Sequence, residues 1–249
     1  MEEYVNKVIQ GDCLEVMPNF PDKSVDMILC DLPYGTTACK WDTIIPFEPL
    51  WEQYKRIIKD NGAIVLTASQ PFTSALVMSN TKMFKYEWIW IKNRGSNFAT
   101  VKYMPIKEHE NILVFGDGTL KYNPQMQERT GGGADRVKYK INPSTSAEVY
   151  NGLVAKESSM RSELRVPSSW QKFNTEVGKH PTQKPVALFE YLIKTYTNEG
   201  DLVLDNCAGS GTLGIASINT KRNYILIEKE KEYCEIGQKR IDELPKQLF

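Results

Sequence analysis

The apolar positions of the N-terminal half fall into short runs that alternate with helical patterns. Five runs have the length of buried strands, in residues 5–9, 25–30, 63–67, 84–92 and 111–115. Two other stretches repeat apolar residues at helical spacing, in residues 46–59 and 72–78. The first helix is expected to stop at Asn61-Gly62, and the second begins after Pro71, which favours a helix start. The aromatic residues Tyr86, Trp88 and Trp90 alternate as in a strand, and we expect them in the core rather than at an interface.

The same alternation returns in the C-terminal part of the chain. Helical spacing occurs in residues 186–196, 213–218 and 231–244, and short apolar runs occur in residues 202–204 and 224–227. Strands that alternate with helices in both parts of a chain are typical of an α/β fold. We therefore predict a doubly wound, mostly parallel sheet.

Between about residues 117 and 180 the apolar periodicity disappears. This stretch contains Gly131-Gly132-Gly133 and scattered Pro, Ser, Asn and Thr residues. Residues 117–184 include eleven Lys or Arg and seven Asp or Glu, whereas the whole chain is neutral. A solvated insertion would have this composition, and so would a basic module that recognises a substrate. We favour the recognition module.

Composition narrows the class of protein. A chain of 249 residues, 41% hydrophobic, can form one sizeable core plus an insertion, or two small domains. Lys plus Arg and Asp plus Glu both number 31, which argues against a purely electrostatic nucleic-acid binder. The five cysteines lack a C-x-x-C pair and there are only two histidines, so we expect reduced thiols and no metal site. No apolar signal segment or membrane-length run is found, so a soluble, cytoplasmic protein is expected.

The stretch from Asp205 to Thr212 joins a predicted strand to a predicted helix and is rich in glycine. Glycines let the backbone approach a ligand closely, and the N-terminus of a helix favours a carboxylate or phosphate. Glu228 ends the next strand, where it can accept hydrogen bonds from ribose hydroxyls. The pattern indicates an adenosine-containing cofactor, either a dinucleotide or S-adenosylmethionine. A glycine-rich turn without any ligand is the alternative.

The place of this loop in the chain argues against an oxidoreductase. In dinucleotide-binding folds the nucleotide loop usually opens the domain. Here one predicted strand and one further helix follow the loop and its own helix. The remaining strands must come from the N-terminal half, so the order of the two halves is permuted.

A second chemical motif, Asp31-Leu32-Pro33-Tyr34, follows the apolar run 25–30. Pro33 biases Leu32 toward an extended conformation, so the Leu32 carbonyl can lie beside the Asp31 carboxylate. Two such acceptors can bind both hydrogens of an exocyclic amino group and stabilise positive charge on its nitrogen. The Tyr34 ring offers a face on which an extruded base can stack. A strand-ending turn with a packing tyrosine is the alternative.

These motifs together resemble the β class of amino DNA methyltransferases, which use S-adenosylmethionine. Residues 31–34 match the family's (Asp/Asn/Ser)-Pro-Pro-(Tyr/Phe) motif, and residues 205–212 match its Asp-Pro-Phe-x-Gly-Ser-Gly-Thr loop. Residues 11–15, 108–115 and 180–185 also resemble family segments. The resemblance implies a Rossmann-like methyltransferase fold in permuted order with an inserted target-recognition region. It assigns 1–116 to the catalytic half, 117–179 to the insertion and 180–249 to the cofactor-binding half.

The resemblance also implies site residues. Asp31, Leu32, Pro33 and Tyr34 would be catalytic. Asp12 would contact the adenine of the cofactor, Glu228 its ribose, and Lys184 its carboxylate. The full set implied for S-adenosylmethionine is Asp12, Cys13, Asp31, Thr182, Lys184, Asp205, Cys207, Gly209, Ser210, Gly211, Thr212 and Glu228.

Two positions depart from the family pattern. Leu32 replaces the first proline, and Asn206-Cys207 replaces Pro-Phe, which removes an aromatic wall and predicts somewhat weaker cofactor binding. Asp in first place of the motif usually accompanies adenine N6 in this family, so adenine is favoured over cytosine N4. A binding module without catalysis, or an RNA substrate, remains an alternative to the enzyme acting on DNA.

Double-stranded DNA is the partner that the resemblance implies, with no membrane and no metal, and members of the class are often homodimers. Arg94 is expected on a flexible loop after the aromatic strand, where it would contact DNA near the extruded base or simply be solvated. The insertion supplies further candidates for phosphate or guanine contacts, namely Arg129, Arg136, Lys138, Lys140, Arg161 and Arg165.

Overall fold

The computed structural model describes residues 1–37, 39, 42–129, 164–176 and 183–245. The chain forms two compact units. One comprises Met1–Asn123 and Ser169–Phe249, and the other comprises Pro124–Ser168.

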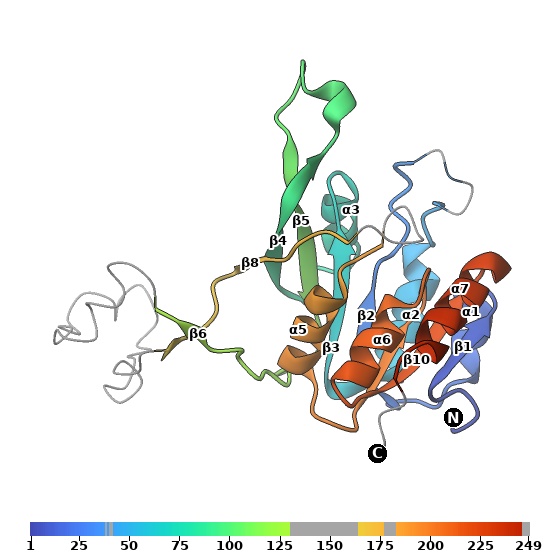
Figure 1. Ribbon diagram of the computed structural model, residues 1–249. Helices are drawn as coiled ribbons and strands as arrows, with labels where there is room; N and C mark the ends of the chain where they lie inside the picture. Colours follow the sequence, from blue (N-terminus) through green and yellow to red (C-terminus); the bar gives the residue numbers. More distant parts are fainter. Residues whose placement is uncertain (38, 40–41, 130–163, 177–182, 246–249) are drawn as a thin grey trace, which may run out of the picture. The chain divides into compact units, whose positions relative to one another are not determined.

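The first unit is built on a sheet of eight strands, in the order β1-β10-β9-β2-β3-β5-β4-β8 (Figure 1). The five strands from β1 to β3 are all parallel, β5 is antiparallel to both β3 and β4, and β8 is parallel to β4. This confirms the predicted doubly wound, mostly parallel sheet. The strands are β1 (Lys7–Gln10), β2 (Val25–Cys30), β3 (Ile58–Ala68), β4 (Phe84–Ser96), β5 (Lys107–Phe115), β8 (Trp170–Lys172), β9 (Leu202–Asp205) and β10 (Asn223–Glu228).

Helices cover both faces of the sheet (Figure 1). One face carries α1 (Cys13–Val16), α2 (Phe47–Ile57) and α3 (Phe72–Ser79), and the other carries α5 (Val186–Tyr196), α6 (Thr212–Asn219) and α7 (Lys231–Asp242). Two short 3-10 turns, η1 (Met17–Asn19) and η2 (Phe98–Thr100), complete the unit. None of the helices in the described part of the chain is long and apolar enough to cross a membrane.

Two hydrophobic cores explain why the central strands are apolar throughout. In β2, Ile28 and Cys30 pack with α2, whereas Met27 and Leu29 pack with α5 on the opposite face. A strand buried on both faces needs apolar residues at every position rather than at alternate ones. Trp88 and Trp90 are buried in the core on the α5 side, as expected, whereas Tyr86 is more exposed.

The order of the strands places the chemical motifs at one edge of the sheet. Strands β2 and β9 are neighbours, and the chain leaves them toward α2 on one face and α6 on the other. Ligands of open α/β sheets bind at the carboxyl ends of strands where the strand order reverses in this way. Asp31 follows β2, while Asp205 and Glu228 end β9 and β10. Strand β1 ends at the same edge, because Gln10 pairs with Glu228.

The hairpin of β4 and β5 is longer than the sequence pattern predicts. Pairing between the two strands continues out to Ser96 and Lys107. The expectation of a flexible loop at Arg94 is therefore wrong, because Arg94 lies within β4. Asn93, Arg94 and Ser96 are exposed in this part of β4, so it leaves no apolar alternation in the sequence.

The second unit contains one described strand pair, formed by β6 (Gln127–Glu128) and β7 (Leu164–Arg165) in antiparallel register. Arg129 and Arg165 lie in this unit, and Arg165 donates to the Ser168 hydroxyl at 2.7 Å. Arg136, Lys138, Lys140 and Arg161 lie outside the described residues. All five cysteines of the chain are free thiols.

Candidate functional site

A cavity of about 870 Å³ opens at the carboxyl ends of the parallel strands. Most of the residues predicted for the site line it. They are Asp12, Cys13, Asp31, Leu32, Pro33, Tyr34, Lys184, Asp205, Cys207, Gly209, Ser210, Thr212 and Glu228. Gly211 adjoins them as the residue before α6, and Thr182 lies outside the described residues. Among the described residues, no group of three or more His, Cys, Asp or Glu side chains is arranged to hold a metal ion.

The glycine-rich loop forms one end of the cavity. Gly211 has a φ of +77°, and a Cβ atom there would come within 3.0 Å of the Gly237 Cα in α7. Only glycine combines this left-handed conformation with so close an approach. The loop is thereby pressed against α7 and turns directly into α6, whose N-terminus favours a negatively charged group of a ligand.

Two carboxylates are fixed beside this loop. Glu228 Oε2 accepts from the Gly209 N–H at 2.7 Å, and Glu228 Oε1 accepts from the Glu230 N–H at 2.9 Å. Burial raises the pKa of Glu228 although these amides oppose the shift. Asp12 caps α1 through the Leu14 N–H at 3.0 Å, and its other oxygen is 3.1 Å from Lys229 Nζ.

The residues that replace the family's Pro-Phe pair have partners of their own. The Tyr54 hydroxyl of α2 donates to Asn206 Oδ1 at 2.5 Å, so the buried amide oxygen is satisfied. The Cys207 sulfur accepts from the Asn206 side-chain amide at 3.6 Å, and Cys207 packs against the core cluster that contains Cys13 and Cys30. A compact cluster of thiols therefore stands where the family pattern has an aromatic ring.

Asp205 is the most perturbed carboxyl group of the cavity. Its side chain is buried and accepts from the Cys207 N–H at 3.0 Å. Burial raises its pKa to about 7. A buried carboxyl that ionises near neutrality is typical of a functional site, although structural networks also shift pKa values.

We expect Asp205→Asn to change how stability depends on pH. Because the folded pKa of Asp205 lies above the value of 3.8 in the unfolded chain, its protonated form stabilises the fold and this contribution declines as pH rises from about 4 through about 7. The free energy of unfolding of the wild type should therefore fall relative to that of Asp205→Asn across this window, by no more than about 4 kcal/mol.

Urea unfolding of both proteins between pH 4 and pH 8 measures this difference. The control is Asp60→Asn, since the exposed Asp60 side chain contacts Lys23 at the surface. If the free energy of unfolding changes with pH equally in wild type and Asp205→Asn across this window, the raised pKa of Asp205 is contradicted.

At the other end of the cavity the Asp31 carboxylate is held by three donors. Lys184 Nζ lies 2.5 Å from Asp31 Oδ2. The Tyr34 hydroxyl donates to Asp31 Oδ1 at 2.8 Å, and the Thr67 hydroxyl of β3 also donates to Oδ1. The carboxylate is therefore fixed in orientation at the end of β2 and carries a cation on one oxygen.

Lys184 is shared between two carboxylates. Its ammonium also lies 3.5 Å from Glu110 Oε2, and Lys92 binds the other oxygen of Glu110. Burial opposes both charges, but Lys184 and Lys92 hold the pKa of Glu110 below its usual value, and Asp31 and Glu110 hold the pKa of Lys184 above its own. The site thus contains a buried, charge-balanced group of two lysines and two carboxylates.

The sequence predictions did not assign Lys92, Glu110 or Thr67 to the site. A signal for two of them was present. In β4, Lys92 continues the alternation that buries Trp88 and Trp90, and in β5 Glu110 continues the alternation of Ile112 and Val114. A charged residue at the inward position of each of two neighbouring strands indicates a buried ion pair.

The Tyr34 ring lies between an aromatic and a cationic neighbour. Its centroid is 5.2 Å from that of Phe72 with an interplanar angle of 26°, and Lys184 Nζ is 5.5 Å from the same centroid. Leu32, which departs from the family's proline, buries its side chain in the core with only 3% exposed. The leucine therefore contributes packing, while the backbone at this position remains at the cavity.

The loop after Tyr34 is closed by Asp42, another residue that sequence analysis did not assign. Its carboxylate accepts from the backbone N–H groups of Gly35, Thr36 and Thr37 at 2.7 to 2.9 Å. These bonds outweigh burial and lower the pKa of Asp42. The loop forms part of the cavity wall.

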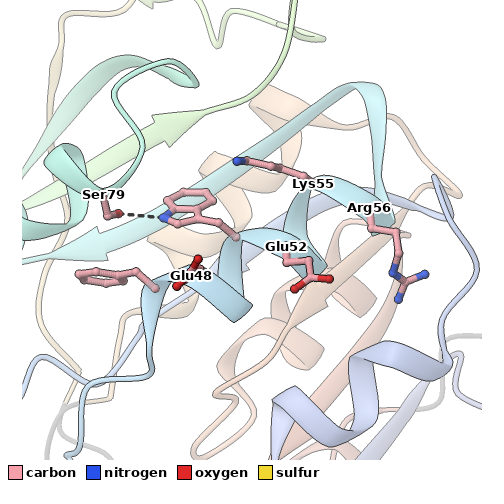
Figure 2. Close-up of a pocket in the computed structure, with 7 residues that line it drawn as sticks. Glu48, Glu52, Lys55, Arg56 and Ser79 are labelled. Atoms are coloured by element: carbon pink, nitrogen blue, oxygen red, sulfur yellow. Dashed lines mark hydrogen bonds between the residues drawn. The ribbon is translucent and has the colours of Figure 1, made fainter.

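A second hollow, of about 800 Å³, lies on the outer side of α2 (Figure 2). Trp51 Nε1 donates to the Ser79 hydroxyl at 2.8 Å on one side of it. Arg56 donates to the carbonyl oxygens of Met17 and Phe20, which ties α2 to the N-terminal segment. The hollow lies away from the sheet edge and contains none of the predicted site residues, so we regard it as structural.

The predicted DNA contacts that the structure describes are Arg94, Arg129 and Arg165. Arg94 is exposed on β4 and is absent from the cavity wall, whereas its neighbours Ser96 and Asn97 line it. Arg129 and Arg165 belong to the unit Pro124–Ser168.

Comparisons with known proteins agree with this geometry. The profile of the N6/N4 methyltransferase family, described as DNA methylase, matches residues 25–239. The type II methyltransferase M2.MboI of Moraxella bovis is 29% identical over 95% of this chain and 88% of its own length. The DNA adenine methyltransferase YhdJ of Escherichia coli is also 29% identical, over 94% of this chain and 82% of its own length.

The fold is also that of a solved methyltransferase. The crystal structure of the M1.HpyAVI complex with S-adenosylmethionine aligns with a TM-score of 0.65 at 24% identity, over 95% of this chain and 98% of that one. The family match spans most of the chain and includes both motifs that meet in the cavity. The chain therefore belongs to the N6/N4 family of DNA methylases, which use S-adenosylmethionine as methyl donor.

Proposed function

We propose that this protein transfers a methyl group from S-adenosylmethionine to the N6 amino group of an adenine extruded from duplex DNA. The observation that carries the proposal is the meeting of Asp31-Leu32-Pro33-Tyr34 and the glycine-rich loop in one cavity. Two relatives similar to this chain are a type II methyltransferase and a DNA adenine methyltransferase.

The cofactor fits the glycine-rich end. Gly211 lets the loop pack closely against Gly237 of α7, and the N-terminus of α6 that follows it suits the carboxylate of the methionine part. Glu228 is oriented by two backbone amides at the end of β10, where it can accept from ribose hydroxyls. When bound, the cofactor supplies an electrophilic methyl group on a positively charged sulfur.

Asp31 and the Leu32 carbonyl bind the hydrogens of the target amino group. Accepting both hydrogens localises the nitrogen lone pair and stabilises the positive charge that develops as the nitrogen attacks the methyl carbon. The methylated nitrogen then releases a proton to solvent, so Asp31 need not act as a general base. Tyr34 provides the ring against which the base lies.

The Lys184 ammonium binds the Asp31 carboxylate. Its second partner, Glu110, has its Oε2 atom buried with no hydrogen bond among the described residues. We include in the proposal that the ammonium moves toward Glu110 when the target amino group binds Asp31. The buried charges remain balanced throughout, because Lys184 keeps a carboxylate partner in both positions.

The proposal also covers recognition of the target sequence, the biological role and the oligomeric state. Residues 117–179 would read the target sequence, with basic residues such as Arg129 and Arg165 on the DNA. The type II names of two relatives fit a role in restriction-modification, in the cytoplasm where the DNA is reached. A homodimer stays a prediction.

The decisive experiment is analysis of the methylated product. The protein is incubated with labelled S-adenosylmethionine and mixed-sequence duplex DNA, and the DNA is digested to nucleosides. We expect N6-methyldeoxyadenosine as the labelled product. N4-methyldeoxycytidine would replace the adenine assignment with the cytosine alternative, and measurable cofactor binding without transfer to DNA would refute both.

A further inference from the structure

The β4–β5 hairpin extends past its neighbour in the sheet (Figure 1). Strand β5 pairs with β3 only from Asn111 to Phe115, whereas its pairing with β4 continues to Lys107 opposite Ser96. Residues 97–106 therefore form a tip that has no strand of the sheet beside it.

Large apolar side chains at this tip are exposed to solvent. Tyr103 is 85% exposed, Phe98 is 65% exposed and Met104 is 52% exposed, and Val101 and Ile106 are exposed beside them. Elsewhere in the first unit, Met78 on α3 is 73% exposed. A contiguous exposed apolar cluster of this kind marks an interaction surface.

The tip is positively charged as well as apolar. Residues 94–107 contain Arg94, Lys102 and Lys107 and no Asp or Glu, although the whole chain is neutral. A protein partner would favour an apolar surface with mixed charges, whereas cations beside aromatic rings complement the phosphates and bases of a nucleic acid.

The base of the hairpin belongs to the catalytic cavity. Ser96, Asn97 and Lys107 line the same cavity as Asp31 and Tyr34. The Asn97 side chain accepts from the Lys107 N–H at 2.9 Å and donates to the Pro105 carbonyl at 3.1 Å. The amide thus connects both arms of the tip, so the exposed rings are held in position beside the opening of the cavity.

We propose that this tip packs against the duplex at the position of the extruded base. The apolar side chains of Phe98, Tyr103 and Met104 contact the base stack that the target nucleotide leaves, and Lys102 and Arg94 contact the flanking phosphates. This inference rests on the proposed function, and it assigns to the hairpin the stabilisation of the opened duplex rather than the reading of its sequence.

The physical reason lies in the cost of extrusion. Removing a base from its stack exposes the faces of its neighbours and costs a few kcal/mol. Apolar side chains that contact unstacked base steps recover part of this free energy. The cost is smallest for a mispaired base, so the contribution of the hairpin should depend on how firmly the target is paired.

The test compares two substrates that differ only at the target base. Both are duplexes that carry the target sequence, which is found by sequencing the methylated DNA at single-base resolution. One has the target base paired and the other has it mispaired. For the double variant Phe98→Ala/Tyr103→Ala we expect at least about a tenfold fall in kcat/KM on the paired duplex. On the mispaired duplex the fall should be clearly smaller. Met78→Ala, which removes an exposed side chain elsewhere, should act like the wild type on both.

A second measurement reports extrusion without chemistry. 2-Aminopurine at the target position becomes fluorescent when it leaves the stack, and the double variant should give a weaker increase than the wild type. Lys102→Gln should weaken binding to both duplexes and reduce its dependence on salt, with the slope of log affinity against log salt smaller by about 1.

Three results would overturn the inference. They are an equal loss on paired and mispaired duplexes, an unchanged 2-aminopurine signal, and a shift of the double variant from dimer to monomer in sedimentation, which would make the tip a contact between two copies of the chain. Failure of the proposed function looks different, because the wild type itself would then transfer no methyl group to either duplex.

Discussion

Replacing Asp31 with alanine is expected to lower the rate of methyl transfer at least about 100-fold. The side chain supplies one of the two acceptors for the target amino group. Removal of a single preorganised group that stabilises developing charge typically has this effect on kcat. Single-turnover transfer of labelled methyl groups at saturating cofactor measures the chemical step.

The controls take into account which partner Lys184 keeps when Asp31 is removed. Alanine would leave the Lys184 ammonium with Glu110, 3.5 Å away, so the cation still has a counter-ion and the fold should survive. Cofactor affinity, measured by calorimetry, should change far less than the rate, because the glycine-rich loop and Glu228 are untouched. Asp31→Asn keeps one acceptor oxygen and should retain more activity than Asp31→Ala. The matched control is Asp60→Ala, an exposed carboxylate.

Full activity in Asp31→Ala would refute the mechanism. If Asp31→Ala is inactive because it no longer folds, the mechanism is tested with Asp31→Asn instead. Asparagine preserves the shape of the side chain. An Asp31→Asn protein that folds and transfers methyl groups at the wild-type rate would equally show that the carboxylate charge has no role.

Replacing Lys184 with methionine should lower the free energy of unfolding by about 3 to 5 kcal/mol at neutral pH. Lys184 is only 7% exposed and faces two carboxylates, Asp31 and Glu110. Methionine matches its length but leaves these charges with Lys92 as their remaining cation. Breaking a buried ion pair by removing one partner is costly, because the other charge stays desolvated.

The pH dependence of this loss has a definite sign. The pKa of Glu110 is held below 4.5, so its stabilising interaction is present above that pH and disappears as pH falls through the lowered folded value. The pKa of Lys184 is raised above 10.5, so its contribution is complete below that pH and is lost as pH rises through the raised value. The difference between wild type and Lys184→Met should be largest between these limits and should shrink below pH 4.5.

Urea unfolding at pH 7 measures how much free energy of unfolding Lys184→Met loses. The same measurement at pH 4 tests whether this loss becomes smaller at low pH. Lys23→Met provides the control, because Lys23 pairs with Asp60 and the two side chains are 60% and 85% exposed. Exposed pairs of this kind contribute about 1 kcal/mol or less. A loss for Lys184→Met no larger than that for Lys23→Met would contradict the buried charge cluster. Methyl transfer should also fall, since Asp31 and Glu110 lose the cation that they share.

Leu32 illustrates how a departure from a family pattern is explained by packing. The proposed chemistry uses its carbonyl and has no use for its side chain. In the structure that side chain is buried in the core beneath the cavity. The proline of the family pattern is therefore replaced by a residue that fixes the same turn through hydrophobic contact instead of through a ring.

By itself the sequence determined the class of fold and the two chemical motifs. Continuous apolar runs can only be strands buried on both faces, and the order of the motifs required a permuted arrangement. Asp31, Tyr34, the glycines at 209 and 211, and Glu228 could be named because local patterns of turn and strand reveal them.

Only the tertiary structure decided which side chains meet across the sheet. Lys92, Glu110 and Lys184 come from separate strands and a distant segment, and their contacts depend on strand order and register, which a linear pattern does not encode. The same holds for the long β4–β5 hairpin, because the outer residues of β4, such as Arg94 and Ser96, are exposed and show no apolar alternation. Contacts between residues far apart in the chain are set by packing of the whole unit, so the buried charge cluster and the exposed tip became visible only in three dimensions.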